Sequence, residues 1–475
     1  MKKVFCLYIF APGLFFFSSA QDKPVVLSLK QCVETALANN FNVQQNGLQM
    51  QADEVNWKQS KLNLLPDLNG SATHGSNQGR SIDPFTNSYI NQNVNYASYG
   101  LNSSVLLFQG FAAQNAIRQN SLNYEASKMD WQQAKDNLTI NIILAYLQVL
   151  NNEDLLTQAN NQATFSKKQV ERLEILDKQG AITPSILYDL KGQYANDQLS
   201  IINVQNSLEV SKINLYQLMN LPYDRNMELE KMNEAELAPK YDALPGDIYQ
   251  TALQQFAQVK AVDLRTQSAM AAIKVARGQL FPRLTLNGSA NTNYSSVADQ
   301  STFINTTDVT TTDYVTVSGT QYQVIQKQNN YSFKTIPYGK QLNNNLFTSV
   351  NLGLQIPIFN SFLQRNRVKL AKINLQNNEL VAKTTKTQLQ QSIELAYSNM
   401  TSAEGRFKTL LEQVNAYEQS FKSAETRFNA GLGTSIDYLT AKNNLDRANI
   451  NLISAKYDYA LRRKILDYYQ GKQLW

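Results

Sequence analysis

Few residues of this chain have the types and spacing that catalytic chemistry needs. Its 475 residues include one histidine, His74, and two cysteines, Cys6 and Cys32. No nucleophile motif and no glycine loop of the kind that holds phosphates accompanies them. A zinc cluster needs about four His or Cys ligands, which so few such residues cannot supply within one chain. We therefore expect neither an enzyme nor a metal or other cofactor site.

The remaining polar candidates lie around two glycine-containing turns. Gly180-Ala181-Ile182-Thr183-Pro184 and Gly431-Leu432-Gly433-Thr434-Ser435 each interrupt a long helical pattern. Glycine permits the reversal of the chain, and Thr183 or Thr434 can cap the helix that follows. Asp437 lies in the first turn after the second reversal, where a carboxylate favours the helix N-terminus. The two turns are predicted to be the tips of two helical hairpins.

The helices that lead to these tips carry the same apolar seam in two copies, about 251 residues apart, which indicates internal duplication. They run from Phe108 to Gln179 and from Phe359 to Ala430, roughly 105 Å each if unbroken at 1.5 Å per residue. The seam alternates steps of four and three, as a coiled coil requires. In the second copy it comprises Leu389, Ile393, Ala396, Met400, Ala403, Phe407, Leu410, Val414, Tyr417, Phe421, Ala424 and Phe428. In the first copy it comprises Leu138, Ile142, Ala145, Val149, Asn152, Leu156, Ala159, Ala163, Ser166, Val170, Leu173 and Asp177, with polar residues at Asn152, Ser166 and Asp177.

Two segments rich in Gly, Ser, Thr, Asn and Tyr, 67 to 107 and 283 to 358, are predicted to form strands. Apolar residues alternate with polar ones from Leu346 to Ile358, and more weakly from Tyr99 to Leu107. The returning partners are expected at Leu68 to His74 and Leu284 to Tyr294, which gives four strands per chain. About ten residues per strand suffice to cross a bilayer, and open strand edges are not tolerated in lipid. The strands therefore require oligomerisation.

The connections around these strands differ in length. Pro66 and Pro282 are predicted to end the helices that precede them. Between the strands, residues 75 to 95 form a short connection, whereas 295 to 345 are long and are expected to be exposed loops.

The N-terminus and the charge balance indicate the compartment. Lys2 and Lys3 precede an apolar stretch, and Ser18-Ser19-Ala20 then offers small residues for cleavage, as in a secretory signal peptide. Only 17% of the residues are charged, and removal of two lysines lowers the net charge from +6 to about +4. No basic cluster favours nucleic-acid binding. The expected organisation is a signal peptide at 1–20, a first repeat at 21–220 with its helical hairpin at 108–220, a segment at 221–247, a second repeat at 248–464 with its hairpin at 359–464, and a C-terminal segment at 465–475.

This order of elements resembles the TolC family of outer-membrane efflux ducts over nearly the whole mature chain. The most specific motifs are Ala36-Leu37-Ala38-Asn39-Asn40 with its echo Ala252-Leu253-Gln254-Gln255, the two helix-ending prolines, and Arg427 to Leu439. The resemblance implies a mainly α-helical homotrimer with a twelve-stranded β-barrel shared by three chains in outer-membrane lipid. It also implies a coiled-coil tunnel through the periplasm and an equatorial collar, for which 221–247 and 465–475 are the candidates.

The resemblance further implies that the tips form a periplasmic entrance, closed at rest and opened by a periplasmic adaptor protein of an inner-membrane transporter. Asp437 matches the first of the inward-facing acids that ring the entrance in family members, where carboxylates attract cations. Thr440 stands at the position of the second acid, Gly433 at that of an arginine, and Phe428 at that of the gating aromatic residue. In the first copy Ile186 corresponds to Asp437, which leaves Ser185 and Asp189 as polar partners. The residues expected to dock the adaptor are Gly180, Ala181, Thr183, Gly431, Leu432, Gly433 and Thr434.

The expected function is therefore an exit duct for efflux across the outer membrane. The exit duct of a type I protein secretion system is an alternative within the same class, and a periplasmic coiled-coil scaffold without a pore is an alternative outside it. The sequence does not indicate the exported substrate.

Overall fold

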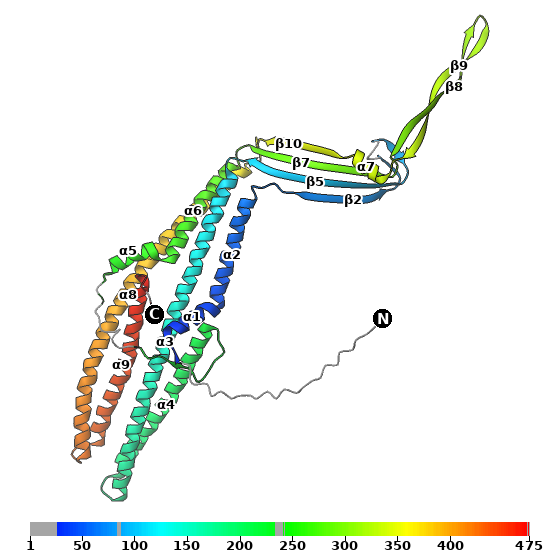
Figure 1. The fold of residues 1–475 in the computed structure, drawn as a ribbon. Coiled ribbons are helices and arrows are strands. Elements are labelled where there is room, and N and C mark those ends of the chain that lie inside the picture. Colours follow the sequence, from blue (N-terminus) through cyan, green and yellow to red (C-terminus); the bar gives the residue numbers. More distant parts are fainter. Residues whose placement is uncertain (1–25, 83–86, 233–240, 242, 473, 475) are drawn as a thin grey trace, which may run out of the picture. The chain divides into compact units, whose positions relative to one another are not determined.

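A computed structural model describes residues 26–82, 87–232, 241, 243–472 and 474 (Figure 1). The expected signal peptide, Trp475 and part of the segment 221–247 lie outside these residues. The chain divides into two compact units. The first contains the described residues up to Met50 together with Ala126–Val262 and Val381–Trp475, and the second contains Gln51–Glu125 and Asp263–Leu380.

The helices confirm the internal duplication, since each helix of the first copy has a counterpart of nearly equal length in the second. The pairs are α1 (Leu29–Asn39) and α5 (Pro245–Gln255), α2 (Phe41–Leu62) and α6 (Ala257–Gly278), α3 (Ala112–Lys178) and α8 (Leu363–Asn429), and α4 (Pro184–Met219) and α9 (Ser435–Tyr469). The short helices repeat after 216 residues, from Leu29 to Pro245, and the long ones after 251, from Ala112 to Leu363. The second copy thus has 35 additional residues between its short and long helices. Among the described residues, no helix combines the length and the apolar character that a membrane crossing needs.

The long helices each begin four residues later than expected from Phe108 and Phe359. In each copy two consecutive residues before the helix have positive φ, at 55° and 59° for Gly110-Phe111 and at 51° and 60° for Ser361-Phe362. Two successive left-handed residues redirect the chain and cannot belong to a right-handed helix. Position 110 also has no room for a side chain, because a Cβ there would lie 2.7 Å from the carbonyl oxygen of Gly278.

The predicted seam faces inward in both long helices. In α3 it is buried or half-buried from Leu138 to Asp177, and in α8 from Leu389 to Phe428. In the first unit the seam contributes Ile142 and Val149 to a core shared with Cys32. Burial raises the pKa of the Cys32 thiol to about 12, so the thiol stays protonated and unreactive.

The predicted four strands form one antiparallel sheet in the second unit. They are β2 (Asn69–Asn77), β5 (Val94–Phe108), β7 (Arg283–Ser295) and β10 (Phe347–Gln355), in the order β10-β7-β5-β2. β10 ends at Gln355, so Ile356 and Ile358 do not belong to it, contrary to the prediction. Gln355 pairs with Arg283, and beyond that pair Pro282 lacks an N–H to donate to the ladder.

The two faces of this sheet differ in polarity. Register places Thr348, Ala290, Leu101 and Gly70 in one row across the four strands, and Leu352 beside Leu286 on the same face. On this face Leu101 is 53% exposed and Leu352 is 62% exposed. The opposite face carries the row Ser349, Ser289, Asn102 and Asn69, and the row Asn351, Asn287 and Ser104. The sheet therefore has an exposed apolar face and a polar face, as strands between lipid and a watery lumen require.

The connection at 295 to 345 is long and mostly exposed, as expected, but most of it is a regular β-hairpin and not an irregular loop. β8 (Asp299–Val317) pairs with β9 (Thr320–Thr335), and the short helix α7 (Tyr338–Asn344) follows (Figure 1). Ser318 and Gly319 have φ of 55° and 87°, which fits a two-residue turn that matches the twist of the strands. Threonine and aromatic residues favour strands even without an apolar face, so apolar alternation did not reveal them. In the first copy the corresponding hairpin is short, β3 (Arg80–Ile82) with β4 (Tyr89–Asn91).

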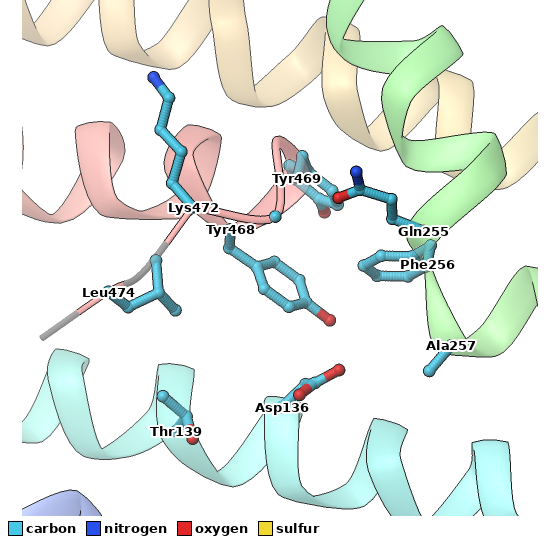
Figure 2. A pocket seen from close by; sticks show the side chains of 10 residues that line it. Asp136, Thr139, Gln255, Phe256, Ala257, Tyr468, Tyr469, Lys472 and Leu474 are labelled. Atoms are coloured by element: carbon cyan, nitrogen blue, oxygen red, sulfur yellow. The ribbon is translucent and has the colours of Figure 1, made fainter.

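The two segments expected to form a collar pack against helices of the first unit. β6 (Glu228–Leu229) pairs in parallel with β1 (Val26–Leu27), and Leu474 is buried in the same core as Leu229. At the end of α9, Tyr468 lies 5.2 Å from Phe256, measured between ring centroids. Figure 2 shows these rings with Asp136 of α3 around a cavity of about 190 Å³. Their role as a collar stays a prediction.

Candidate functional site

The two hairpin tips have the same backbone design. Gly180 has φ of 70° and Gly431 has φ of 74°, as the predicted reversals require. After each glycine the next N–H returns to the last helical turn, from Ala181 to the Leu176 carbonyl at 2.8 Å and from Leu432 to the Arg427 carbonyl at 2.9 Å. This is the Schellman arrangement, which satisfies carbonyls that the helix leaves free.

The caps that follow the reversals differ. The hydroxyl of Thr434 accepts a hydrogen bond from the N–H of Asp437 at 3.1 Å and donates one to the Asp437 carboxylate at 2.8 Å. Thr183 also stands at the N-cap, but its side chain makes no capping hydrogen bond, contrary to the prediction. At the third helical position α9 has Asp437 and α4 has Ile186, which has no polar group for a reciprocal cap.

The predicted entrance residues are mostly at the surface. Ser185, Asp189, Asp437 and Thr440 are exposed, and Phe428 is half-buried. Among the predicted docking residues Gly433 is half-buried, and the exposed ones are Gly180, Ala181, Thr183, Gly431, Leu432 and Thr434.

Gly433 is restricted by space, whereas the other tip glycines are restricted by φ. A Cβ at this position would lie 3.2 Å from the backbone nitrogen of Phe428. A larger residue here would therefore require the end of α8 to shift.

Polar contacts join the two tips. The guanidinium of Arg172, in α3, donates to the side chain of Asn429 and, at 3.0 Å, to its backbone carbonyl. The hydroxyl of Ser435, at the start of α9, donates to the carboxylate of Asp189 in α4 at 3.4 Å. Each contact links the first hairpin to the second. Of the residues predicted to form the entrance or to dock the adaptor, only Asp189 takes part in these contacts, whereas Ser435 belongs to the predicted turn itself.

An apolar cluster centred on Tyr438 supports these contacts. The Tyr438 ring is 1% exposed and stacks on Phe428, with ring centroids 4.7 Å apart. Leu187 and Leu190 of α4 belong to the same cluster. The hydroxyl of Tyr438 is buried and has no hydrogen-bond partner among the described residues. An unpaired buried hydroxyl costs about 1–3 kcal/mol.

A buried charge cluster joins the hairpins further from the tips. The amine of Lys442, in α9, lies 3.2 Å from a carboxylate oxygen of Asp197 in α4 and 2.6 Å from one of Asp446. The side chains of Lys442 and Asp197 are 3% and 7% exposed. Asp197 also accepts hydrogen bonds from Ser166 and, at 2.8 Å, from Gln193. Buried charges are tolerated in a protein only when they are paired and hydrogen-bonded in this way.

Burial raises the pKa of Asp446, although the amine of Lys442 opposes this shift. Loss of solvation is the main cause of the raised pKa, and the nearby carboxylate of Asp197 adds a smaller contribution in the same direction.

Sequence reasoning missed this cluster and Arg172. Two signals for the cluster were present: Ser166 interrupts the apolar seam, and Lys442 and Asp446 are four residues apart in one helix, where their side chains meet. No signal in a single sequence identifies Asp197 as their partner, because it lies 245 residues from Lys442.

Known proteins share this architecture. TolC of Escherichia coli (strain K12) is 20% identical over 449 residues, which cover 92% of this chain and 80% of TolC. Toxin and drug export protein A of Aggregatibacter actinomycetemcomitans is 20% identical over 435 residues, covering 90% and 83%. Among solved structures, CusC superposes with a TM-score of 0.76 at 16% identity and covers 96% of both chains. The outer membrane protein VceC of Vibrio cholerae has a TM-score of 0.74 at 16% identity, covering 94% of this chain and 97% of VceC.

The sequence pattern of the family described as outer membrane efflux protein matches residues 32–221 and 248–471. The match includes both hairpins and both strand pairs, so the expected fold, the outer-membrane location and the role as an exit duct for efflux are confirmed. The chain belongs to the outer membrane efflux protein family.

Proposed function

We propose that three copies of this chain form a duct whose periplasmic entrance is held closed by the contacts between the two hairpins. The polar sheet faces of three copies line a shared twelve-stranded barrel, and the apolar faces contact lipid. A periplasmic adaptor of an inner-membrane transporter docks at the tips and separates the hairpins. The observation that carries this proposal is the set of polar contacts between the hairpins, Arg172 with Asn429, Ser435 with Asp189, and Lys442 with Asp197.

These contacts are suited to a gate because they differ in strength along the hairpins. At the tips Arg172, Asn429 and Asp189 are exposed and Ser435 is buried, so water replaces most of the paired groups at little cost when the tips separate. The Lys442 cluster is buried, and separating it would leave uncompensated charges. Opening is therefore expected at the tips, with the charge cluster as the fixed end of the movement.

The Tyr438 hydroxyl favours the same movement. It lacks a partner while the tips are together, and separation of the tips would give it access to water. The closed arrangement thus contains a local cost that an adaptor can release.

Single-channel recording in planar bilayers tests the gate. Arg172→Ala removes the tip contact with Asn429 and is expected to increase the open fraction, whereas the exposed Arg427→Ala at the end of α8 is the matched control. Asp437→Ala is expected to reduce cation selectivity, since three carboxylates at a narrow entrance attract cations. An unchanged open fraction in Arg172→Ala would refute a gate at this contact, and absence of any conductance would refute the duct.

Photo-crosslinking in cells tests the partner. A photo-reactive residue at Gly180 or Leu432 is expected to capture an adaptor, whereas one at Leu199, which is 55% exposed on α4 away from the tip, is the control. An adaptor of a proton-driven pump would indicate small-molecule efflux. An adaptor of an ATP-driven exporter would indicate type I protein secretion, an alternative that stays open because one relative is named for both toxin and drug export. Capture of no adaptor would count against docking at the tips.

A further inference from the structure

The base of the long hairpin β8–β9 is held by the hydrogen bonds of one buried side chain, Gln341, and we call this connection the joint. Gln341 of α7 is fully buried, and its amide donates to the carbonyls of Ser295 at 3.0 Å and Ile336 at 2.7 Å. Its side-chain oxygen accepts from the N–H of Ser295 at 3.0 Å. Since Ser295 precedes β8 and Ile336 follows β9, one side chain ties both ends of the hairpin together. Such a joint is unnecessary for a loop without a defined position.

Beyond this joint the hairpin is exposed on both faces. At 3.4 Å per residue the 16 residues of β9 extend roughly 50 Å. Large apolar side chains lie along it with high exposure, namely Phe303, Ile304, Tyr314, Tyr322, Ile325 and Phe333, each between 54% and 69% exposed. A two-stranded hairpin has no core of its own and is at best marginally stable in water. Its two outer edges also lack ladder partners among the described residues, so the hairpin is suited to pairing with other strands.

The equivalent hairpin of the first copy offers an internal comparison. β3 and β4 have three residues each, too few to expose a comparable surface. The duplicated fold therefore does not require a long hairpin, and the 35 additional residues of the second copy are expected to serve a role that the first copy does not have.

Charge and position favour a second copy of the same chain as the partner. The hairpin carries Asp299, Asp308 and Asp313 against Lys327 and Lys334, and Asp308 lies directly opposite Lys327. With so little net charge, identical hairpins do not repel one another strongly. In the sequence the hairpin follows β7 and precedes β10, and β10 is an edge strand of the four-stranded sheet. In the proposed trimer this edge pairs with the next copy, so each hairpin starts beside a subunit boundary.

We propose that the β8–β9 hairpins of the three copies associate with one another beyond the sheet, through their exposed apolar side chains and unpaired edges. The association rests on the proposed trimer and extends its interface. Tethering three hairpins at one rim raises their effective concentration, so weak contacts suffice.

Photo-crosslinking of the full-length protein in its membrane tests this interface. A photo-reactive phenylalanine analogue replaces Tyr314 or Tyr322, and it replaces Tyr89 of the short hairpin as the matched control. With the analogue at position 314 or 322, the expected products are covalent dimers and trimers of this chain, identified by mass spectrometry. With the analogue at position 89, these products are expected to be absent. Uncrosslinked chain only, or capture of a different protein at 314 and 322, would overturn the proposal.

A charge variant provides a second readout that leaves the joint intact. Val309→Lys with Ile325→Lys places like charges on all three hairpins and is expected to abolish the dimer and trimer products and to lower the temperature at which trimers dissociate. The particle mass in detergent separates the two proposals. A monomeric mass of the unaltered protein would refute the trimer itself, whereas a trimeric mass without crosslinks at 314 and 322 would refute only the hairpin association.

Discussion

The long helices α3 and α8 have equal length but bury different seams. Each has 67 residues. In α8 the seam is buried from Leu389 to Ala403, except for the half-buried Ala396, and every position from Phe407 onward is half-buried, although all positions are apolar. In α3 burial continues to Leu173, although polar residues interrupt the seam.

Two of the three polar seam positions of α3, Asn152 and Ser166, therefore make specific contacts and are not weakened copies of an apolar pattern. Asn152 is 6% exposed and donates to the Ser207 carbonyl at 3.0 Å and the Ser211 hydroxyl at 3.1 Å, both in α4. Ser166 is fully buried and donates to Asp197. The polar interruptions of the apolar repeat therefore identify α3 as the long helix with buried polar partners. Ser166 is linked through Asp197 to Lys442, which belongs to the second hairpin.

The largest expected effect comes from removing the cation of the buried cluster. Lys442→Met leaves Asp197 and Asp446 without their shared partner and is expected to lower the stability by about 3–5 kcal/mol. Thermal unfolding of the purified protein measures the change. Lys408→Met is the matched control, because Lys408 pairs with Glu404 at the surface and its side chain is 69% exposed. Equal effects of the two substitutions would show that the buried cluster has no special role.

Exchanging the two seams at one position is expected to have a smaller effect. Asn152 and Ala403 are equivalent positions, 251 residues apart. Asn152→Ala removes two hydrogen bonds, and Ala403→Asn puts an amide into an apolar core, so each is expected to cost about 1–3 kcal/mol. Thermal unfolding of both variants measures this. If Ala403→Asn left the unfolding temperature unchanged, both seams would accommodate a buried polar side chain equally well.

The pH dependence of stability tests Asp446. Its pKa is raised in the folded protein, so the folded state retains a proton that the unfolded chain has released. Stability from this group is present at low pH and is lost as the pH rises from the ordinary range of an aspartate through the raised value, by about 1.4 kcal/mol per unit of pKa difference.

Asp446→Asn is expected to flatten this dependence, measured as unfolding temperature against pH. Lys442 and Asp197 are the charged groups that face Asp446 and are retained in the variant. Asp458→Asn, which alters a more exposed pair with Arg462, is the control. An unchanged pH profile in Asp446→Asn would assign the dependence to another group.

The smallest expected effect compares the two tips. Thr434→Ala removes a side-chain cap and is expected to destabilise the start of α9 by about 1 kcal/mol. Thr183→Ala is expected to change little, because Thr183 makes no side-chain cap. Hydrogen exchange of the first turns of α9 and α4 measures both. A comparable increase in exchange at the two tips would contradict the difference between the caps.

Much of the architecture could be predicted because it depends on local periodicity. The steps of four and three placed α3 and α8 within a few residues, and the alternation from Leu346 located β10. Proline and glycine located the junctions, since both act through the conformation of their own residue. The β8–β9 hairpin was missed because its polar, threonine-rich strands lack the apolar alternation on which the prediction relied.

The candidate gate could be predicted only in part. Glycine at 180 and 431 and the cap at Thr434 follow from rules that act within one turn of helix. The contacts of Arg172 with Asn429 and of Lys442 with Asp197 join residues more than 240 positions apart. Their charges look like ordinary solvated residues until the hairpins are packed together.

The sequence by itself determined the duplication, the lengths of the long helices and the turns at their tips, because neighbouring residues decide these features through backbone conformation and periodic burial. Only the tertiary structure decided which polar residues become buried partners. A charge is stabilised inside a protein by groups that surround it in space, and those groups come from different helices.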